Sequence, residues 1–130
     1  MGKKHVFVLA LAILIAVPAI SQTGGTAQAS QSAQRSQRAV FAGEWKVGTG
    51  AGNSTFLITL ASDGTATKSM GAGRGTWEVV GAEARISWDD GWHDVIRKAG
   101  NHYEKAAYAP GKSYTDAPSN ITGATRTQPL

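Results

Sequence analysis

The feature that most constrains the fold is an alternation of apolar and polar residues that begins at Gly43. Four segments carry apolar residues at every second position: Trp45 and Val47, then Phe56, Ile58 and Leu60, then Trp77 and Val79, and finally Ala84, Ile86 and Trp88. Successive side chains of a strand point to opposite faces, so this period of two predicts half-buried strands. Weaker patterns predict strands at Thr65–Ser69, His93–Lys98 and His102–Tyr108.

Turn-forming pairs separate these segments. They are Asp63-Gly64, Gly81-Ala82, Asp90-Gly91 and Gly100-Asn101. Gly, Asn and Asp accept the positive φ angles that tight hairpins require. Strands at this spacing predict an all-β domain over residues 43–109, with about six to eight antiparallel strands in a meander. Such a meander forms a barrel or a partly open barrel.

The first 21 residues have the composition of a secretory signal peptide. Lys3 and Lys4 precede the unbroken apolar run of residues 6–17, and small residues follow Pro18. This order of charged, apolar and small residues predicts export, with cleavage after Ser21 or Ala29. Twelve apolar residues are short for a membrane span, which needs about twenty. A secreted or periplasmic protein is therefore expected, with an uncleaved membrane anchor as the alternative.

Two polar segments flank the predicted domain. Residues 22–42 are rich in Gln, Ser, Ala, Gly and Thr, which predicts a flexible low-complexity linker. A short helix there would have no apolar face to bury. Residues 110–130 are polar and contain three of the four prolines. This segment is expected to be either a disordered tail or an irregular strap laid over the barrel.

Composition excludes several kinds of site. The chain has no cysteine, which removes disulfides, zinc–thiolate sites and thiol nucleophiles. It has 13 basic and 9 acidic residues, but residues 43–109 contain seven basic and eight acidic ones. A nucleic-acid-binding protein needs a concentrated basic patch, and the balanced charges of residues 43–109 predict no such patch.

Sequence motifs for catalysis are also missing. Residues 109–113 end like a phosphate-binding loop, but Ala106 stands where that motif requires glycine. The chain has no Gly-x-Ser-x-Gly nucleophile elbow. We therefore expect no catalytic residue and no cofactor, and the protein is predicted not to be an enzyme.

The titratable residues of the domain do not have metal-ligand spacing. His93 and His102 are nine positions apart, and no third ligand stands at a fitting distance from them. They are expected to be ordinary surface or packing residues. Asp89, Asp90 and Asp94 lack the alternating oxygen ligands of a calcium loop, so a solvated hairpin tip is predicted there and no metal site.

The four tryptophans are the most informative side chains for binding. Trp45, Trp77 and Trp88 are in phase with the apolar faces of their strands, which predicts core packing. Trp92 directly follows the Asp90-Gly91 turn, where a large side chain is hard to cover. It is predicted to be the most exposed tryptophan and the aromatic platform for a ligand or partner. The alternative is that Trp92 folds over the end of the barrel as a plug.

Short motifs resemble those of a known group of barrels. Gly43-Glu44-Trp45 resembles the Gly-x-Trp opening of the calycins, which include lipocalins and avidins. Ser54-Thr55-Phe56, followed by Asp63-Gly64-Thr65, is similar to the avidin form. The resemblance implies an antiparallel barrel that binds a small ligand at one end, with Ser54 as a ligand contact. Val47 stands where avidins carry a polar biotin contact, so the resemblance does not imply biotin binding.

These observations leave three functions in competition. The first is a binding module for an unknown small molecule, glycan or peptide. The second is a structural or interaction protein of the cell envelope, with no small ligand. The third is a small hydrolase. Tryptophan density and the calycin-like opening favour the first, with Trp92 and Ser54 as its candidate ligand contacts, and the oligomeric state is left open.

Overall fold

The computed structural model describes Gly2 and residues 23–130, and the predicted signal peptide lies outside them, apart from Gly2. One helix, α1 (Thr23–Phe41), precedes eight strands, and a short 3₁₀ helix, η1 (Met70–Ala72), lies between the third and fourth strands. The strands are β1 (Gly43–Gly48), β2 (Thr55–Leu60), β3 (Thr65–Lys68), β4 (Arg74–Val80), β5 (Glu83–Trp88), β6 (His93–Ala99), β7 (His102–Tyr108) and β8 (Asn120–Pro129).

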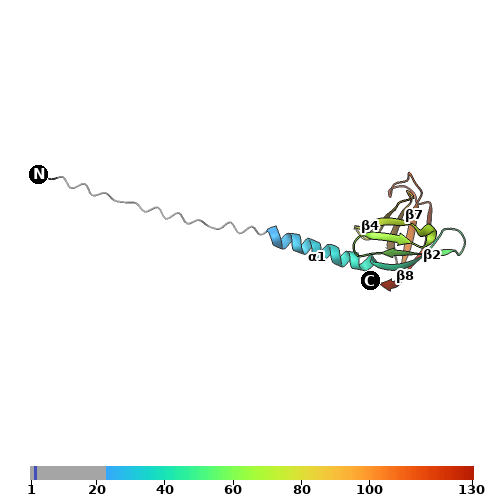
Figure 1. The fold of residues 1–130 in the computed structure, drawn as a ribbon, viewed down its shortest axis with the longest axis horizontal. Coiled ribbons are helices and arrows are strands. Elements are labelled where there is room, and N and C mark those ends of the chain that lie inside the picture. Colours follow the sequence, from blue (N-terminus) through green and yellow to red (C-terminus); the bar gives the residue numbers. More distant parts are fainter. Residues whose placement is uncertain (1, 3–22) are drawn as a thin grey trace.

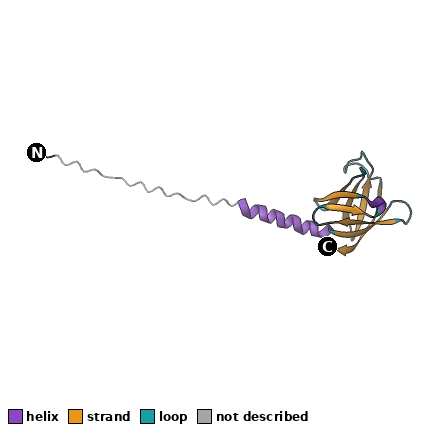
Figure 2. Ribbon diagram, in the orientation of Figure 1, coloured by secondary structure: helices purple, strands orange, loops and turns teal. Residues whose placement is uncertain are grey.

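The eight strands form a closed antiparallel barrel, as Figures 1 and 2 show. Each strand pairs with its neighbours in the sequence, and β8 returns to pair with β1 from Gly43↔Pro129 to Val47↔Ala124. The predicted meander and its barrel are therefore confirmed. An eight-stranded barrel has an interior just wide enough to be filled by side chains or to hold one small ligand.

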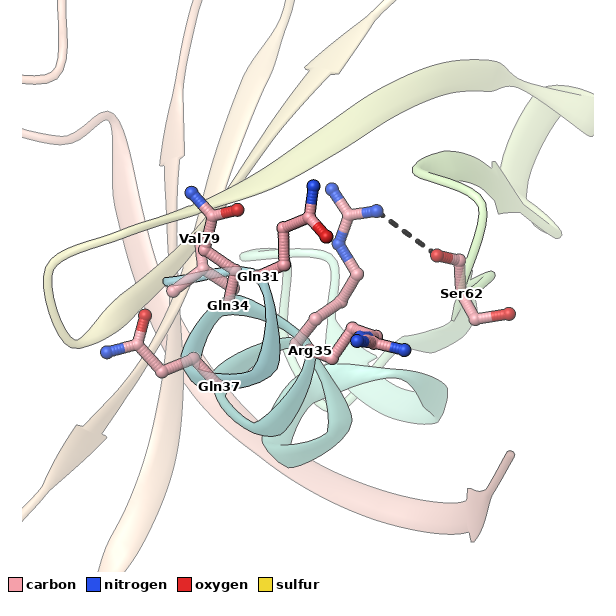
Figure 3. Close-up of a pocket in the computed structure, with 7 residues that line it drawn as sticks. Gln31, Gln34, Arg35, Gln37, Ser62 and Val79 are labelled. Carbon is pink, nitrogen blue, oxygen red and sulfur yellow. Dashed lines mark hydrogen bonds between the residues drawn. The ribbon is translucent and has the colours of Figure 1, made fainter. Parts of the chain in front are cut away.

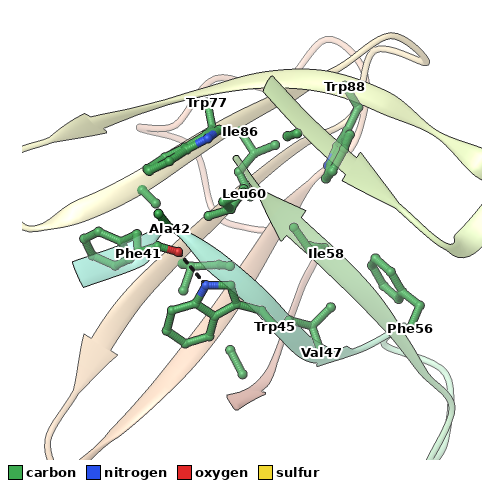
Figure 4. Packing of buried hydrophobic residues seen from close by; sticks show 14 residues of the cluster. Phe41, Ala42, Trp45, Val47, Phe56, Ile58, Leu60, Trp77, Ile86 and Trp88 are labelled. Atoms are coloured by element: carbon green, nitrogen blue, oxygen red, sulfur yellow. Dashed lines mark hydrogen bonds between the residues drawn. The ribbon is translucent and has the colours of Figure 1, made fainter. Parts of the chain in front are cut away.

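The barrel interior holds the apolar residues that the alternation placed there. Trp45, Ile58, Leu60 and Ile86 are fully buried, and Trp77 and Trp88 pack beside them (Figure 4). This confirms the predicted core role of three tryptophans. Burying such side chains contributes about 1.5–3 kcal/mol each, and this core supplies the stability that disulfides give many small exported domains.

The barrel extends beyond the predicted domain boundary at residue 109. Residues 120–129 form β8, so the prediction of a polar tail over 110–130 is wrong for this part. The signal was weak because the residues of β8 on its more buried side are small or polar, with Thr122 and Arg126 on either side of buried Ala124. Barrel closure orders the segment, since β8 pairs with both β1 and β7.

Residues 109–119 form a strap on the outer face of the barrel, which confirms the second alternative for this part of the segment. Tyr114 packs against Tyr108 with their ring centroids 5.7 Å apart, and Arg85 lies over the Tyr114 ring. The backbone N–H of Ser119 donates to the carbonyl of Ala107 at 2.7 Å. A small second cluster of buried residues, with Val95 at its centre, lies beneath the strap.

The segment 22–42 was predicted to be a flexible linker, but the structure shows helix α1 over Thr23–Phe41. Ala and Gln favour helix formation, and the C-terminal end of α1 is fixed by tertiary contacts. Phe41 is buried in the barrel core, and Arg38 lies over the Trp77 ring and donates to the carbonyl of Ser62. Apart from Arg38, residues 25–40 are exposed, and α1 projects away from the barrel (Figure 1). No helix in the described part of the chain is long and apolar enough to cross a membrane.

Candidate functional site

One end of the barrel is closed by the junction between α1 and β1. The indole N–H of Trp45 donates to the carbonyl of Phe41 at 2.7 Å (Figure 4), and the Tyr103 ring meets both aromatic rings edge-on. Arg126 of β8 donates to the carbonyls of Ala39 and Ala42 at the end of the helix. These contacts place an aromatic cluster and the end of α1 across this end of the barrel.

A cavity of about 140 Å³ opens at the opposite end. Its walls come from five strands, the loop after β1, η1 and the β5–β6 turn. We call this set of residues the barrel mouth: Thr49, Phe56, Lys68, Met70, Asp90, Trp92, Asp94, Lys105, Ala107 and Asn120. A cavity of roughly 150 Å³ accommodates a molecule the size of benzene. The barrel mouth therefore has room for a small molecule.

Charged side chains face inward at the barrel mouth. The charged residues buried in the described part of the chain are Lys68, Asp94 and Lys105, which are 8%, 4% and 2% exposed. Each has the inward phase of its strand, with Lys68 two positions after buried Ala66 and Asp94 two positions before buried Ile96. Burying a charge costs free energy unless it is paired and hydrogen-bonded, so the partners of each group matter.

Lys105 has few partners for a buried ammonium group. Its Nζ donates to the carbonyl of Gly48 at 2.8 Å and lies 4.9 Å from the centroid of the Phe56 ring. Burial lowers the pKa of Lys105, and the charge of Asp94 opposes this effect. No carboxylate of the described residues lies within 4.0 Å of its Nζ. An ammonium has three donors, so Lys105 has capacity for further acceptors.

Asp94 lies on the neighbouring strand, where it pairs with Ala107 across the β6–β7 ladder. Its Oδ2 accepts a hydrogen bond from the indole N–H of Trp88 at 2.8 Å. Burial raises the pKa of Asp94, while the nearby Lys105 charge and the Trp88 hydrogen bond act in the opposite direction. The predicted solvated hairpin tip is therefore wrong for Asp94, because the strand phase turns its side chain into the barrel.

Lys68, in contrast, has a carboxylate in direct contact. Its Nζ forms a 2.8 Å ion pair with Asp90 and lies 4.7 Å from the centroid of the Trp88 ring. Asp90 also accepts from the backbone N–H of Trp92, and the Lys68 hydrogen bond is the main cause that lowers the pKa of Asp90. The Asp90 side chain is 46% exposed. This pair fixes the β5–β6 turn at the rim of the barrel mouth.

Asn120, at the start of β8, brings an acceptor with no partner. Its Oδ1 is buried and accepts no hydrogen bond from any described residue. The loop after β1 packs tightly on this side chain, because a Cβ at Gly50, whose φ is +88°, would lie 2.7 Å from Asn120 Cγ. An unsatisfied buried acceptor costs about 1–3 kcal/mol, and a ligand that donates to it would remove this cost.

The structure separates the two predicted site residues. Trp92 lines the cavity and is partly buried against the core, so it is less exposed than predicted, although it is the most exposed of the four tryptophans. Ser54 is exposed in the loop before β2 and does not line the cavity. Its carbonyl accepts from the backbone N–H of Thr49, which does.

The histidines lie apart from the barrel mouth. His93 begins β6 and packs on Tyr114 of the strap, while His102 begins β7 at the other end of the same hairpin. The described residues include no group of three His, Asp or Glu side chains that could hold a metal ion. The barrel mouth is thus assembled from lysine, carboxylate, amide and aromatic groups.

A second hollow lies between α1 and the barrel (Figure 3). It has a volume of about 440 Å³ and is lined by Gln31, Gln34, Arg35, Gln37, Arg38, Ser62 and Val79. Its side chains are mostly exposed, and Arg38 already donates to the carbonyl of Ser62. The barrel mouth is the stronger candidate, because its charged groups are buried and their hydrogen-bonding capacity is incompletely used.

Comparison with protein-family models, curated proteins and solved structures finds no match for this chain. The assignment of the candidate site therefore depends on the geometry of the barrel mouth alone. Sequence reasoning missed Lys68, Asp94, Lys105 and Asn120. For the first three a signal was present: each is a charged residue at an inward position of a predicted strand, where apolar residues are expected.

Proposed function

We propose that this chain is an exported, non-enzymatic binding protein whose barrel mouth holds a small molecule. The closed barrel supports this proposal, since barrels of this size bind ligands at an open end. The helix junction lies at one end of the barrel, and the cavity lies at the other end with Trp92 and Met70 in its lining.

One observation carries the proposal. Lys105 is 2% exposed, lines a cavity and has an unfilled hydrogen-bonding capacity, and the same cavity is lined by Asn120, whose buried Oδ1 has no hydrogen-bond partner among the described residues. A barrel selected only for stability would have apolar residues at these positions, because replacing buried charges by apolar residues is often stabilising. Perturbed groups in a cavity are characteristic of functional sites.

Export is the second part of the proposal. It is supported by the charged and apolar pattern of the first 21 residues. A protein without cysteine keeps its fold in an oxidising compartment, because its stability does not depend on thiol chemistry. Helix α1 would then hold the barrel at a distance from the processed N-terminus.

Native mass spectrometry of the protein purified from its own host tests the binding function. We expect a bound small molecule that denaturation releases. Ala107 lines the cavity and is buried, so Ala107→Met would place a longer side chain in the ligand space and abolish the retained mass. Ala82→Met, in the exposed β4–β5 turn, is the matched control and should retain it. Equal ligand content in the two variants, or none in the wild type, would contradict the proposal.

A further inference from the structure

The ion pairs at the barrel mouth are incomplete. Lys68 is paired with Asp90 at the rim, whereas Lys105 and Asp94 are buried and neither has an ion pair within 4.0 Å among the described residues. Charges in a low-dielectric interior interact strongly, whereas an exposed charge is screened by water. A buried ammonium group with no carboxylate in direct contact can take an anionic group of a ligand as its partner.

Lys105 is the buried lysine with no carboxylate in direct contact, and the charge of Asp94 acts on it from beyond ion-pair distance. Lys68 has Asp90 at 2.8 Å, whereas Lys105 contacts only a neutral carbonyl, that of Gly48, and an aromatic ring. A carboxylate is a compact monoanion whose oxygens accept short, charge-assisted hydrogen bonds from an ammonium. A phosphate would bring nearly two negative charges, more than this site compensates.

Asn120 adds a second requirement. Its buried Oδ1 needs a donor, and a carboxylate has none at neutral pH. A hydroxyl group on the ligand would donate to this oxygen without adding charge. An ammonium group would also donate, but it would cancel the negative charge that Lys105 requires.

The remaining wall of the barrel mouth is apolar. Phe56, Met70 and Trp92 line the cavity together with the polar groups. Aromatic rings and methionine pack well against a small apolar body. On these grounds, and building on the proposed binding function, we infer that the ligand is a small hydroxycarboxylate whose carboxylate pairs with Lys105 and whose hydroxyl donates to Asn120.

Mandelate and its close analogues test this inference on protein produced from the full chain and freed of any retained ligand. Phenylacetate lacks the hydroxyl, mandelamide lacks the charge, and phenylglycine carries an ammonium in place of the hydroxyl. Dissociation constants are measured by NMR titration. A hydrogen bond to a charged group contributes about 1.5–3 kcal/mol, so mandelate should bind at least about tenfold more tightly than mandelamide. Mandelate should bind about fivefold more tightly than phenylacetate, because one neutral hydrogen bond contributes an effect of this size.

Lys105→Met identifies the group responsible. This variant keeps the length of the side chain and removes its charge, so the preference for mandelate over mandelamide should disappear. Lys98→Met, at an exposed position of β6, is the matched control and should keep the preference. The wild-type comparison of the four probes decides the inference by itself if Lys105→Met fails to fold.

The outcomes separate this inference from the binding function on which it rests. Equal or tighter binding of mandelamide, or a preference that survives Lys105→Met, would overturn the hydroxycarboxylate assignment and leave the binding function standing. Failure of every probe to bind at millimolar concentration would also overturn the assignment. The binding function fails only if the protein from its host carries no ligand at the barrel mouth.

Discussion

The buried ammonium group of Lys105 lies 4.9 Å from the centroid of the Phe56 ring. No carboxylate of the described residues lies within 4.0 Å of this ammonium group. Phe56 comes from β2 and Lys105 from β7, so barrel closure alone brings the two side chains together. A cation–π contact compensates a buried charge only in part, with about 2 kcal/mol when desolvated. This arrangement supports the proposal that this end of the barrel holds a ligand.

The binding role of Lys105 predicts a gain in stability when the charge is removed. In Lys105→Met the desolvation cost disappears, and the Gly48 carbonyl keeps a hydrogen bond from Thr122 at 3.3 Å. We expect the free energy of unfolding of the ligand-free protein to rise by about 1 kcal/mol, measured by urea denaturation. A loss of more than about 2 kcal/mol would instead show that Lys105 is a structural residue.

The core can be tested at Trp77. This side chain is 3% exposed, and its indole N–H donates to the carbonyl of Ala61 at 2.7 Å. Trp77→Ala should cost about 3–5 kcal/mol and leave a domain of this size largely unfolded by circular dichroism. Val40→Ala, at an exposed position of α1, is the control and should change stability by less than about 0.5 kcal/mol.

Asp94 predicts a specific dependence of stability on pH. Its folded pKa is raised above the ordinary value of 3.8, so between the two values the folded state binds more protons than the unfolded state. The stabilisation from this group is therefore complete below pH 3.8 and is lost as the pH rises through the folded pKa.

Asp94→Asn isolates this effect, because the amide oxygen still accepts from Trp88. As the pH rises from 3 to 7, the unfolding free energy of the wild type should fall relative to that of Asp94→Asn. Urea titrations at about unit steps of pH measure this difference. Asp89→Asn, at an exposed position of the same turn, should show no such trend. If the unfolding free energy of the wild type instead rises relative to that of Asp94→Asn, the pKa of Asp94 is lowered in the folded state, by the charge of Lys105.

Much of the fold could be predicted from the sequence, because apolar residues recur at every second position of a strand that is buried on one face. Trp45, Trp77 and Trp88 were placed in the core on this basis and are there. The pattern failed at β8, whose buried residue Ala124 is too small to stand out, and at α1, whose contacts to the barrel come from its last turn.

The candidate site was only partly predictable. The position of Trp92 after a turn predicts a binding residue, and Trp92 does line the cavity. The calycin-like motif predicts Ser54 as a contact, but Ser54 lies in the exposed loop before β2. No motif predicts Lys105 or Asn120, because the site forms only when strands far apart in the sequence meet at one end of a closed barrel.

Export gives a prediction at the N-terminus of the mature protein. Sequencing of the exported protein should begin near Gln22 or Ser30, after cleavage by signal peptidase. Either site leaves Arg38 and Phe41, which anchor α1 to the barrel. Recovery of Met1 or Gly2 from a membrane fraction would support the uncleaved anchor instead.

The most direct test of the central claim compares ¹H–¹⁵N NMR spectra of the protein as purified from its host with spectra after unfolding, dialysis and refolding. Removal of the native ligand should shift the amide signals around the barrel mouth, at Phe56, Trp92, Lys105 and Asn120. Signals of α1 should stay in place, and adding back the released small molecules should reverse the shifts. Identical spectra before and after, or shifts confined to the hollow beside α1, would contradict a binding site at the barrel mouth.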